Sequence, residues 1–166
     1  MTTAWSRQQH SGRPEPKPPA GPVSPEPGRF AGRGIRVLVA EDNLVNQKVA
    51  VKMLERLGVR ADIAMNGREA IQKFGDLPYD LILMDCHMPE IDGYTATAEI
   101  RRRHAAHRVP IVAMTAEAME GCRETCLAAG MDDYIAKPVK LSDLSEALGK
   151  WLPEGSNQPS ALSNQL

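Results

Sequence analysis

Five polar side chains in this sequence stand directly after short apolar runs. They are Glu41, Asp42, Asp85, Thr115 and Lys137. Short apolar runs bounded by turn residues are typical of strands buried on both faces of a parallel sheet. Because the carboxyl ends of parallel strands meet at one edge, where ligands also bind, we expect the five side chains to gather there.

This set of side chains suits one kind of chemistry. Three carboxylates in one cleft repel each other unless a cation neutralises them, and Mg²⁺ binds through one or two carboxylates together with a phosphate. A carboxylate can also attack phosphorus and become an aspartyl phosphate. The transferring phosphoryl oxygens then need positive charge and hydrogen-bond donors, which Lys137 and Thr115 can supply. The pattern therefore predicts a phosphoryl-accepting site.

The segments that must position these side chains alternate between strand-like and helix-like patterns. This alternation predicts an α/β fold with five parallel strands in a doubly wound sheet, a (βα)₅ arrangement. We expect strands over 35–40, 60–64, 81–85, 111–114 and 133–136. We expect helices over 44–57, 68–74, 94–104, 117–129 and 141–151.

The first two helices carry the clearest boundary signals. Asn43 is expected to cap the first helix and Gly58 to end it. Gly75 and Pro78 are expected to close the second helix. The first helix is expected to place its apolar residues on one face, namely Val45, Val49, Met53, Leu54 and Leu57.

Composition divides the 166 residues into a core and two ends. With 42% hydrophobic and 25% charged residues, the chain fits one globular domain. Residues 1–33 hold about half of the 13 prolines and few aliphatic residues, so we predict a disordered linker there. Residues 34–152 form the predicted domain, and 153–166 a flexible tail. The proline-rich leader could also serve as a peptide ligand, but a plain linker is the favoured interpretation.

Charge and hydropathy exclude several classes of function. The formal net charge is −1, which gives no reason to expect nucleic-acid or membrane binding. Arginines at 101–103 form a local basic patch, but cations are common at helix carboxyl ends. No apolar stretch approaches the roughly 20 residues that span a bilayer, and the amino terminus lacks the apolar core of a signal peptide.

The three cysteines indicate a reducing compartment and not a disulfide-bonded scaffold. Cys86, Cys122 and Cys126 are an odd number without scaffold spacing, so a reducing, cytoplasmic location is expected. Cys86 and His87 have no second pair at ligand spacing, so a zinc site is disfavoured. Cys122 and Cys126 share a helix face and could form a redox-sensitive pair across chains, although filling small positions is the favoured interpretation.

Four motifs, in order and at suitable spacing, resemble those of response-regulator receiver domains. They are Val39-Ala40-Glu41-Asp42-Asn43, Met84-Asp85 with Met88-Pro89-Glu90-Ile91-Asp92-Gly93, Met114-Thr115-Ala116-Glu117-Ala118-Met119, and Asp132-Asp133-Tyr134-Ile135-Ala136-Lys137-Pro138. The resemblance covers about residues 35–151. The sequences of these motifs are most similar to those of the receivers of hybrid sensor histidine kinases. The resemblance implies the flavodoxin-like receiver fold.

The resemblance assigns a role to each candidate residue. It implies that Asp85 accepts a phosphoryl group from a phosphohistidine. Mg²⁺ would be held by Glu41, Asp42, Asp85 and the backbone carbonyl of His87. Thr115 would bond the phosphate and Lys137 would pair with it. Tyr134 resembles the aromatic switch residue whose rotamer follows Thr115, and the Lys137-Pro138 bond is often cis in this family.

The family also implies partners and limits. A sensor histidine kinase or a histidine-containing phosphotransfer protein would be the partner, and a phosphorylation-dependent dimer is left open. A receiver only phosphorylates and dephosphorylates itself, so it is not an enzyme in the usual sense, whether it stands alone or belongs to a hybrid histidine kinase.

Two other classes of function remain to be tested. A docking module could keep the fold without phosphorylation, although no acidic, Thr or Lys position is lost here. A hydrolase of the haloacid dehalogenase type would need an aspartate two residues after the nucleophile, where this sequence has His87.

Overall fold

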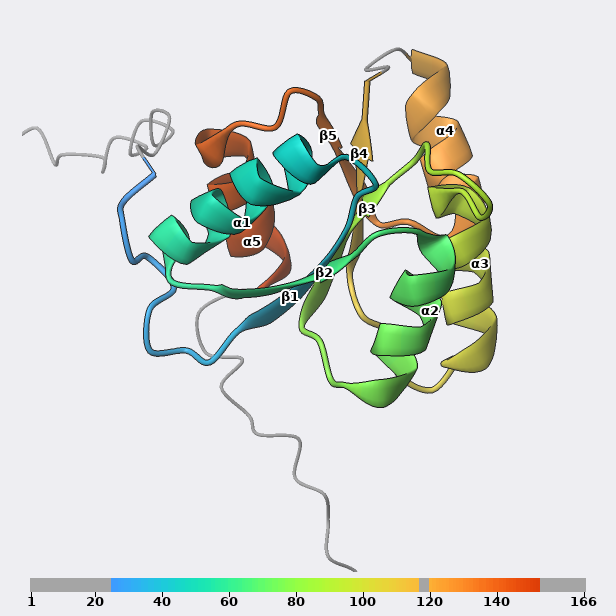
Figure 1. The fold of residues 1–166 in the computed structure, drawn as a ribbon, viewed down its shortest axis with the longest axis horizontal. Helices are drawn as coiled ribbons and strands as arrows, with labels where there is room; N and C mark the ends of the chain where they lie inside the picture. The colour runs from blue at the N-terminus through green and yellow to red at the C-terminus, as the bar shows by residue number, and fades with distance from the viewer. Residues whose placement is uncertain (1–24, 117–119, 153–166) are drawn as a thin grey trace, which may run out of the picture.

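The computed structural model describes residues 25–116 and 120–152, which form one α/β domain. Strands and helices alternate as the sequence predicts (Figure 1). The order is β1 (Arg36–Ala40), α1 (Leu44–Leu57), β2 (Arg60–Ala64), α2 (Gly67–Asp76), β3 (Leu81–Asp85), α3 (Gly93–Arg103), β4 (Ile111–Thr115), α4 (Glu120–Ala129), β5 (Asp133–Ala136) and α5 (Leu141–Trp151). Within these residues, no helix is long and apolar enough to cross a bilayer.

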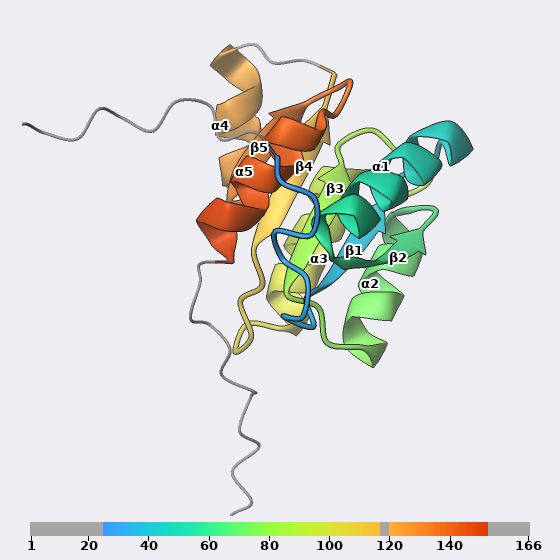
Figure 2. The ribbon, with the colours of Figure 1, turned by 90° about the vertical axis from the view of Figure 1, so that its left-hand side faces the viewer.

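The five strands form one parallel sheet in the order β2-β1-β3-β4-β5. Every residue of β3 and β4 is buried, because helices cover both faces of the sheet. Figures 1 and 2 show α1 and α5 on one face, and α2, α3 and α4 on the other. The predicted doubly wound fold is confirmed.

Alternate residues of β1, β3 and β4 contribute to two separate apolar cores. Val37 and Val39 of β1 pack with Leu54 of α1 and Leu148 of α5 on one side. On the other side, Leu38 and Ala40 of the same strand belong to the core beneath α2, α3 and α4. This alternation follows from the strand geometry, in which successive side chains point to opposite faces. The sheet is thereby fixed on both faces, and its strand ends are held in register.

The caps of α1 are those that the sequence predicts, but its buried face is different. The Asn43 side chain accepts hydrogen bonds from the backbone N–H groups of Val45 and Asn46, and Gly58 ends the helix with φ of 85°. The buried residues are Gln47, Ala50, Leu54 and Leu57, whereas Val45 and Val49 are 68% and 42% exposed.

The predicted apolar face of α1 is therefore wrong for Val45 and Val49, and helix geometry gives the reason. At about 100° per residue, Val45 and Val49 lie nearly opposite Gln47 on the helix circumference. The apolar arc of the helix is broad: Met53, Leu54 and Leu57 face the core beneath the helix, and Val45 and Val49 lie at the exposed end of the arc.

Helix α2 runs further than predicted. It passes through Gly75 and ends at Asp76, followed by Leu77 in an extended conformation. Leu77 precedes Pro78, and a residue before proline is sterically disfavoured in helical geometry. Proline, not glycine, therefore stops this helix. Helix α3 starts at Gly93 because Asp92 caps it through the Thr95 N–H. The predicted start of α4 at 117 falls on residues 117–119, outside the described residues.

Residues 25–33, here called the strap, lie on the domain instead of forming the end of a linker. Phe30 is only 2% exposed, and its N–H donates to the Leu57 carbonyl at 2.8 Å. Arg29 donates to the Ser145 carbonyl and hydroxyl at 3.1 and 2.9 Å, and Arg33 to the Leu152 carbonyl at 3.0 Å. Figure 2 shows the strap crossing the seam between α1 and α5.

The predicted linker boundary at residue 33 is therefore wrong for the described part of that segment. One aromatic side chain supplies the apolar burial that the surrounding proline and glycine residues lack. The rest of the predicted linker, residues 1–24, and the predicted tail, residues 153–166, lie outside the described residues.

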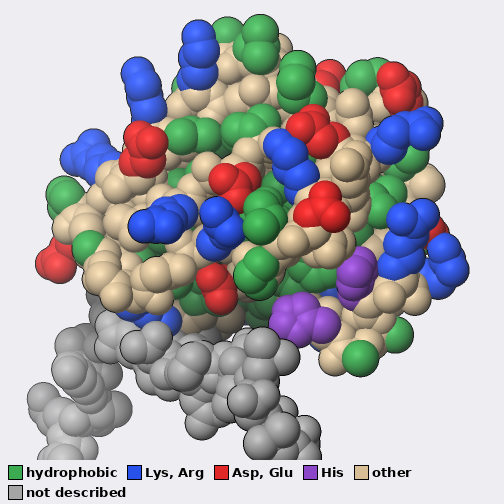
Figure 3. Space-filling model, turned by 60° about the horizontal axis from the view of Figure 1, so that its bottom comes forward, with side chains coloured by type: hydrophobic (Ala, Val, Ile, Leu, Met, Phe, Trp, Pro, Cys, Tyr) green, Lys and Arg blue, Asp and Glu red, His purple; other side chains and the backbone are tan. Residues whose placement is uncertain are grey.

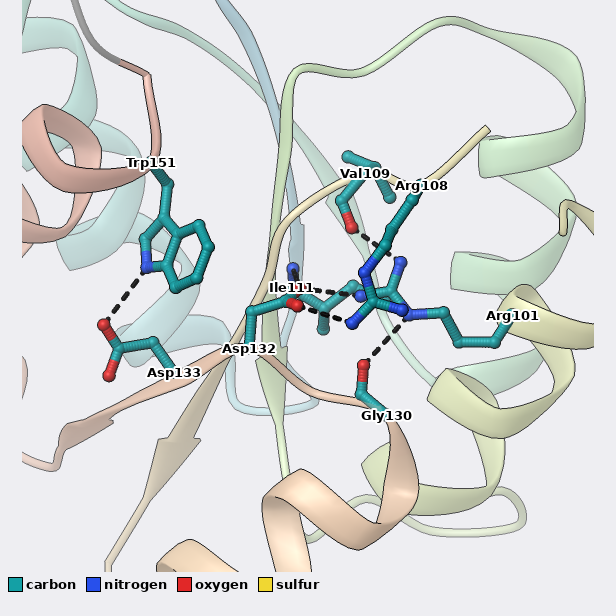
Figure 4. A network of polar contacts seen from close by, with 8 residues as sticks. All are labelled: Arg101, Arg108, Val109, Ile111, Gly130, Asp132, Asp133 and Trp151. Carbon is teal, nitrogen blue, oxygen red and sulfur yellow. Dashed lines mark hydrogen bonds and ion pairs between the residues drawn. The ribbon is translucent and has the colours of Figure 1, made fainter. Parts of the chain in front are cut away.

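The edge of the sheet where the strands begin is closed by arginines and aspartates (Figure 4). Arg101 of α3 donates to the carbonyls of Gly130 and Val109 and to the carboxylate of Asp132. Arg108 donates to the other Asp132 oxygen at 2.7 Å. On the surface below the sheet, acidic and basic side chains lie interspersed (Figure 3). This edge pairs its charges internally.

Candidate functional site

The opposite edge of the sheet gathers three carboxylates. Glu41 and Asp42 follow β1, and Asp85 is the last residue of β3. One oxygen of each lies within 4.8 Å of the others. Glu41 and Asp85 are 2% and 3% exposed, whereas Asp42 is open to solvent. The convergence predicted from the strand ends is confirmed for these three residues.

Lys137 brings one positive charge into this cluster. It follows β5, and its Nζ lies 2.8 Å from Glu41 Oε2 and 2.8 Å from Asp85 Oδ2. Three carboxylates thus face one ammonium group, which leaves two negative charges without a cation among the described side chains. An oxygen-rich cluster with surplus negative charge fits a hard divalent cation such as Mg²⁺.

Electrostatics at Asp85 reflect both burial and pairing. Burial raises the pKa of the Asp85 carboxyl; the Lys137 ammonium and the His87 N–H oppose this, and Glu41 adds to it. Burial lowers the pKa of Lys137, but its hydrogen bonds to Asp85 and Glu41 outweigh this, so the net shift is upward. Asp85 is therefore a carboxylate whose charge the folded protein stabilises incompletely, as expected where a cation or a phosphoryl group completes the site.

Two residues of α1 hold Glu41 in place, and no role was predicted for either. Asn46 Nδ2 donates to Glu41 Oε1 at 3.1 Å, and Gln47 Nε2 donates to the Glu41 carbonyl at 2.7 Å. Both lie in the first turn after the Asn43 cap, so the cap sets their direction toward the carboxylate cluster. The sequence signal that could have identified Asn46 and Gln47 was their position in the first turn of a helix whose capping residue directly follows the two carboxylates.

A tight loop shapes the approach to Asp85. The His87 N–H donates to Asp85 Oδ1 at 3.1 Å, and the Gly93 N–H donates to the Cys86 carbonyl at 3.1 Å. A Cβ at position 93 would lie 2.1 Å from the Asp85 carbonyl oxygen, so only glycine fits there. The role predicted for the His87 carbonyl in metal binding remains a prediction.

Thr115 and Tyr134 lie on neighbouring strands but in different environments. Thr115 ends β4 and is 1% exposed, and its carbonyl accepts from the Lys137 N–H at 2.8 Å. Tyr134 of β5 pairs in register with Ala113 and is 37% exposed. The Lys137–Pro138 bond is cis, as the resemblance implies. The structure thus places Thr115 beside the loop of Lys137 and leaves Tyr134 at the surface.

Comparison with known proteins now identifies the family. Residues 37–149 match the family model described as the response regulator receiver domain. The chain belongs to the response regulator receiver family. The resemblance that the four motifs carry is thereby confirmed, and the matched residues include all five polar strand-end residues.

Known receivers show how far the similarity extends. Hybrid signal transduction protein dokA of Dictyostelium discoideum is 42% identical over 122 residues, covering 73% of this chain and 7% of that protein. The receiver domain of sensor histidine kinase PA1611 from Pseudomonas aeruginosa PAO1, solved with a magnesium ion coordinated in the active site cleft, is 48% identical with a TM-score of 0.67. The match covers 72% of this chain and 98% of that one.

A third receiver was solved with a partner. It is the receiver domain of Ssk1 from Saccharomyces cerevisiae, in a co-crystal with the histidine phosphotransfer protein Ypd1. It is 31% identical with a TM-score of 0.66, and the match covers 71% of this chain and 88% of that one. The present chain spans 7%, 15% and 4% of the first three curated relatives, so it corresponds to one domain of proteins of that kind.

The receiver site continues onto an apolar surface of α1. Leu44, Val45 and Val49 are 61%, 68% and 42% exposed, directly after the Glu41-Asp42 pair. A hollow of about 380 Å³ beside them is lined by Val49, Met114, Lys137 and other residues of the same region. Polar chemistry and exposed apolar surface thus lie side by side at this edge.

Proposed function

We propose that this receiver accepts a phosphoryl group from a phosphohistidine onto Asp85 and works in a two-component phosphorelay. One observation carries the proposal. The buried Asp85 carboxylate lies in a cluster of three carboxylates, and its Oδ2 is 2.8 Å from the Nζ of Lys137, the single cation of that cluster among the described side chains. A purely structural aspartate at a strand end needs neither burial among two other carboxylates nor a shared ammonium group.

The transfer can be written for the two oxygens of Asp85. Oδ1 accepts from the His87 N–H and Oδ2 faces Lys137. A carboxylate oxygen attacks phosphorus, an O–P bond forms, the P–N bond to imidazole breaks, and the electron pair returns to the ring nitrogen. Glu41, Asp42 and Asp85 would hold Mg²⁺, which when bound supplies positive charge to the phosphoryl oxygens. Lys137 adds a second cation that this chain itself provides.

The same proposal includes a switch. Phosphorylation adds roughly −1.5 to −2 charge, which competes with Glu41 for Lys137 and draws the Thr115 hydroxyl toward the phosphoryl oxygens. Thr115 is buried at the end of β4, so its movement would open space for Tyr134 on the adjacent strand. The charge would thereby bias an existing equilibrium between two conformations.

The exposed apolar residues Leu44, Val45 and Val49 suit a partner that must approach Asp85. We assign this surface to a histidine-containing phosphotransfer protein or a sensor histidine kinase, in line with the Ypd1 co-crystal and the hybrid kinase relatives. The three free cysteines support a reducing, cytoplasmic setting. A phosphorylation-dependent dimer remains a prediction, to be tested by the molecular mass in solution with and without phosphodonor.

Intact mass spectrometry after incubation with phosphoramidate or acetyl phosphate tests this function. Wild type should gain one phosphoryl group in the presence of Mg²⁺, and Asp85→Asn should gain none. Asp133→Asn is the matched control, since it removes a carboxylate at the opposite edge of the sheet, and it should be phosphorylated like wild type. No adduct on folded wild type would favour the docking module, and steady turnover of phosphodonor together with hydrolysis of unrelated phosphate substrates would favour the hydrolase.

A further inference from the structure

A cluster of three thiols lies beside the phosphoryl-accepting site, and the proposed transfer does not use it. Cys86 follows Asp85 directly and is fully buried, and Cys126 of α4 is 2% exposed. Cys122, one turn earlier on α4, is partly exposed and packs against the same core. All three are free. Their position beneath the loop of Asp85 makes their chemistry relevant to the receiver.

Distances single out one pair within the cluster. Cys122 Sγ lies 3.8 Å from Cys126 Sγ, and it also lies 3.4 Å from Thr115 Oγ1, close enough for a weak hydrogen bond. Cys122 therefore contacts both another thiol and the threonine expected to move on phosphorylation. A chemical change at the Cys122 sulfur therefore alters a direct contact of the Thr115 hydroxyl.

Access and acidity separate the roles of the two thiols. Cys122 is the partly exposed member, so a dissolved oxidant reaches its sulfur first. Burial raises the pKa of Cys126 to about 12, so that thiol stays protonated at neutral pH. Because the thiolate is the reactive form, Cys126 does not start an oxidation, but it lies within reach of an oxidised Cys122.

We propose that Cys122 and Cys126 are a dithiol oxidation site that a peroxide closes to a disulfide within α4. The Cys122 sulfur attacks a peroxide oxygen, so that an S–O bond forms, the O–O bond breaks and hydroxide leaves to become water. The Cys126 sulfur then attacks the Cys122 sulfur and passes its proton to the departing oxygen, so that an S–S bond forms and the S–O bond breaks to release the second water. Two thiols and one hydrogen peroxide give one disulfide and two waters.

Helix geometry makes this disulfide a reversible one. Cβ atoms four residues apart on a helix are about 5–6 Å apart, whereas a disulfide holds them at about 3.5–4.5 Å. Closing the bond therefore distorts the first half of α4 and draws the Cys122 sulfur away from Thr115. Strained disulfides are easily reduced, as a regulatory bond requires.

The effect on signalling rests on the proposed function. Phosphorylation is expected to move Thr115, and oxidation removes the Cys122 contact that Thr115 has in the reduced protein. Oxidation should therefore shift the balance between the two conformations of Thr115, and the phosphorylated fraction should change with it.

Peptide mapping tests the disulfide without any phosphorylation. The full chain is treated with hydrogen peroxide, blocked with N-ethylmaleimide and digested with trypsin. Arg123 lies between the two cysteines, and Arg101 separates them from Cys86, so trypsin places each cysteine in its own peptide. A Cys122–Cys126 bond therefore appears as two peptides joined through sulfur and released by reductant. Wild type, Asp85→Asn and Cys86→Ser should all give this linked pair, on a monomeric protein.

Other products overturn the inference. Three products would each show that Cys122 and Cys126 are not the site. They are a Cys86–Cys126 disulfide, a disulfide between two chains, and a Cys122 sulfur that is oxidised to an acid without forming a disulfide. Full labelling of all three thiols after peroxide treatment would do the same. Cys122→Ser and Cys126→Ser should both abolish the linked peptides; if either retains them, the assignment is wrong.

A second measurement tests the link to the switch. The phosphorylated fraction with limiting phosphoramidate and Mg²⁺ is compared in reduced and oxidised protein. We expect the ratio of phosphorylated to free protein to change by about fivefold in wild type, and to stay unchanged in Cys122→Ser. If reduced wild type is not phosphorylated, the proposed function fails, whatever the peptide map shows. If it is phosphorylated but no linked pair forms, only the thiol inference fails.

Discussion

The two edges of the sheet each hold acidic residues, but they differ in how the negative charge is compensated. At the edge where the strands begin, both oxygens of Asp132 are occupied, by Arg101 and the Ile111 N–H on one oxygen and by Arg108 on the other, at 2.7 to 2.8 Å (Figure 4). At the edge where the strands end, one lysine serves two buried carboxylates.

The difference separates a structural role from a functional one. Arginine forks that fill every acceptor site of a carboxylate leave nothing for a ligand to add. A surplus of negative charge costs stability, and it persists here where a cation and a phosphoryl group are expected to complete the site. Fully paired acidic residues such as Asp132 are therefore expected to maintain the fold, and the incompletely paired ones to carry the proposed chemistry.

The largest predicted effect concerns the paired edge. Arg101→Ala should lower the free energy of unfolding by about 3 kcal/mol, because Asp132 loses its less exposed cation and two carbonyls lose their donor in a largely buried network. Urea denaturation measures this. Arg108→Ala is the control: its side chain is 64% exposed, so the loss should stay below about 1 kcal/mol. Equal losses for the two variants would contradict the assigned roles.

Removing the one cation of the other edge should have the next largest effect. Lys137→Met leaves Glu41 and Asp85 without their ammonium partner and should cost about 2 kcal/mol of unfolding free energy in chelator. Added Mg²⁺ should recover part of the loss, because it replaces the missing charge. Lys150→Met, which removes a 59% exposed partner of Asp133, should cost less than about 1 kcal/mol and be insensitive to Mg²⁺.

Mg²⁺ itself should distinguish the edges. At tenfold its dissociation constant, a cation that binds only the folded protein raises the unfolding free energy by about 1.4 kcal/mol. Wild type and Asp133→Asn should both show this gain in thermal or urea unfolding, and Asp85→Asn should lose most of it. An undiminished gain in Asp85→Asn would place the ion elsewhere.

Neutralising a carboxylate should have opposite signs at the two edges. Asp85→Asn removes one of the surplus charges and should stabilise the metal-free protein by about 1 kcal/mol. Asp132→Asn should instead destabilise it, since two guanidinium groups lose their partner. Unfolding free energies in chelator at neutral pH decide this, and stabilisation of both variants would remove the contrast between the edges.

The smallest effect is on pH dependence. The pKa of Asp85 is raised above its ordinary value of 3.8, so its contribution to stability is present below pH 3.8 and is lost as the pH rises through the folded value. The pKa of Asp133 is lowered, so its contribution is present above pH 3.8 and is lost as the pH falls through the folded value. Differences in unfolding free energy between wild type and each Asn variant should therefore slope in opposite directions below neutral pH.

Local signals predicted most of the fold and the positions of the five strand-end residues. Apolar runs marked the strands, and the cap at Asn43 was identified because it depends on neighbouring residues only. The buried face of α1 was missed because periodicity shows that Val45 and Val49 share a stripe but not whether that stripe meets the sheet. Similarly, the Arg101–Asp132 ion pair joins residues far apart in the chain, so no local sequence pattern predicts it.

At the candidate site, residue types predicted the chemistry, and tertiary packing supplied the rest. The support of Glu41 by Asn46 depends on the direction in which α1 leaves its cap. The proximity of Cys122 to Thr115 depends on how α4 lies against the end of β4. Both contacts depend on the angles at which helices lie against the sheet, and a sequence pattern does not encode those angles.

The strap changes how a longer chain would present this domain. The backbone of residues 25–33 lies along the seam between α1 and α5 before it reaches the start of β1, because Phe30 and Arg29 fix its path. A tether to an upstream phosphodonor thus loses residues 25–33 from its free length. Since effective concentration depends on tether length and on the point of attachment, the strap would help set how often Asp85 meets a phosphodonor tethered to the same chain.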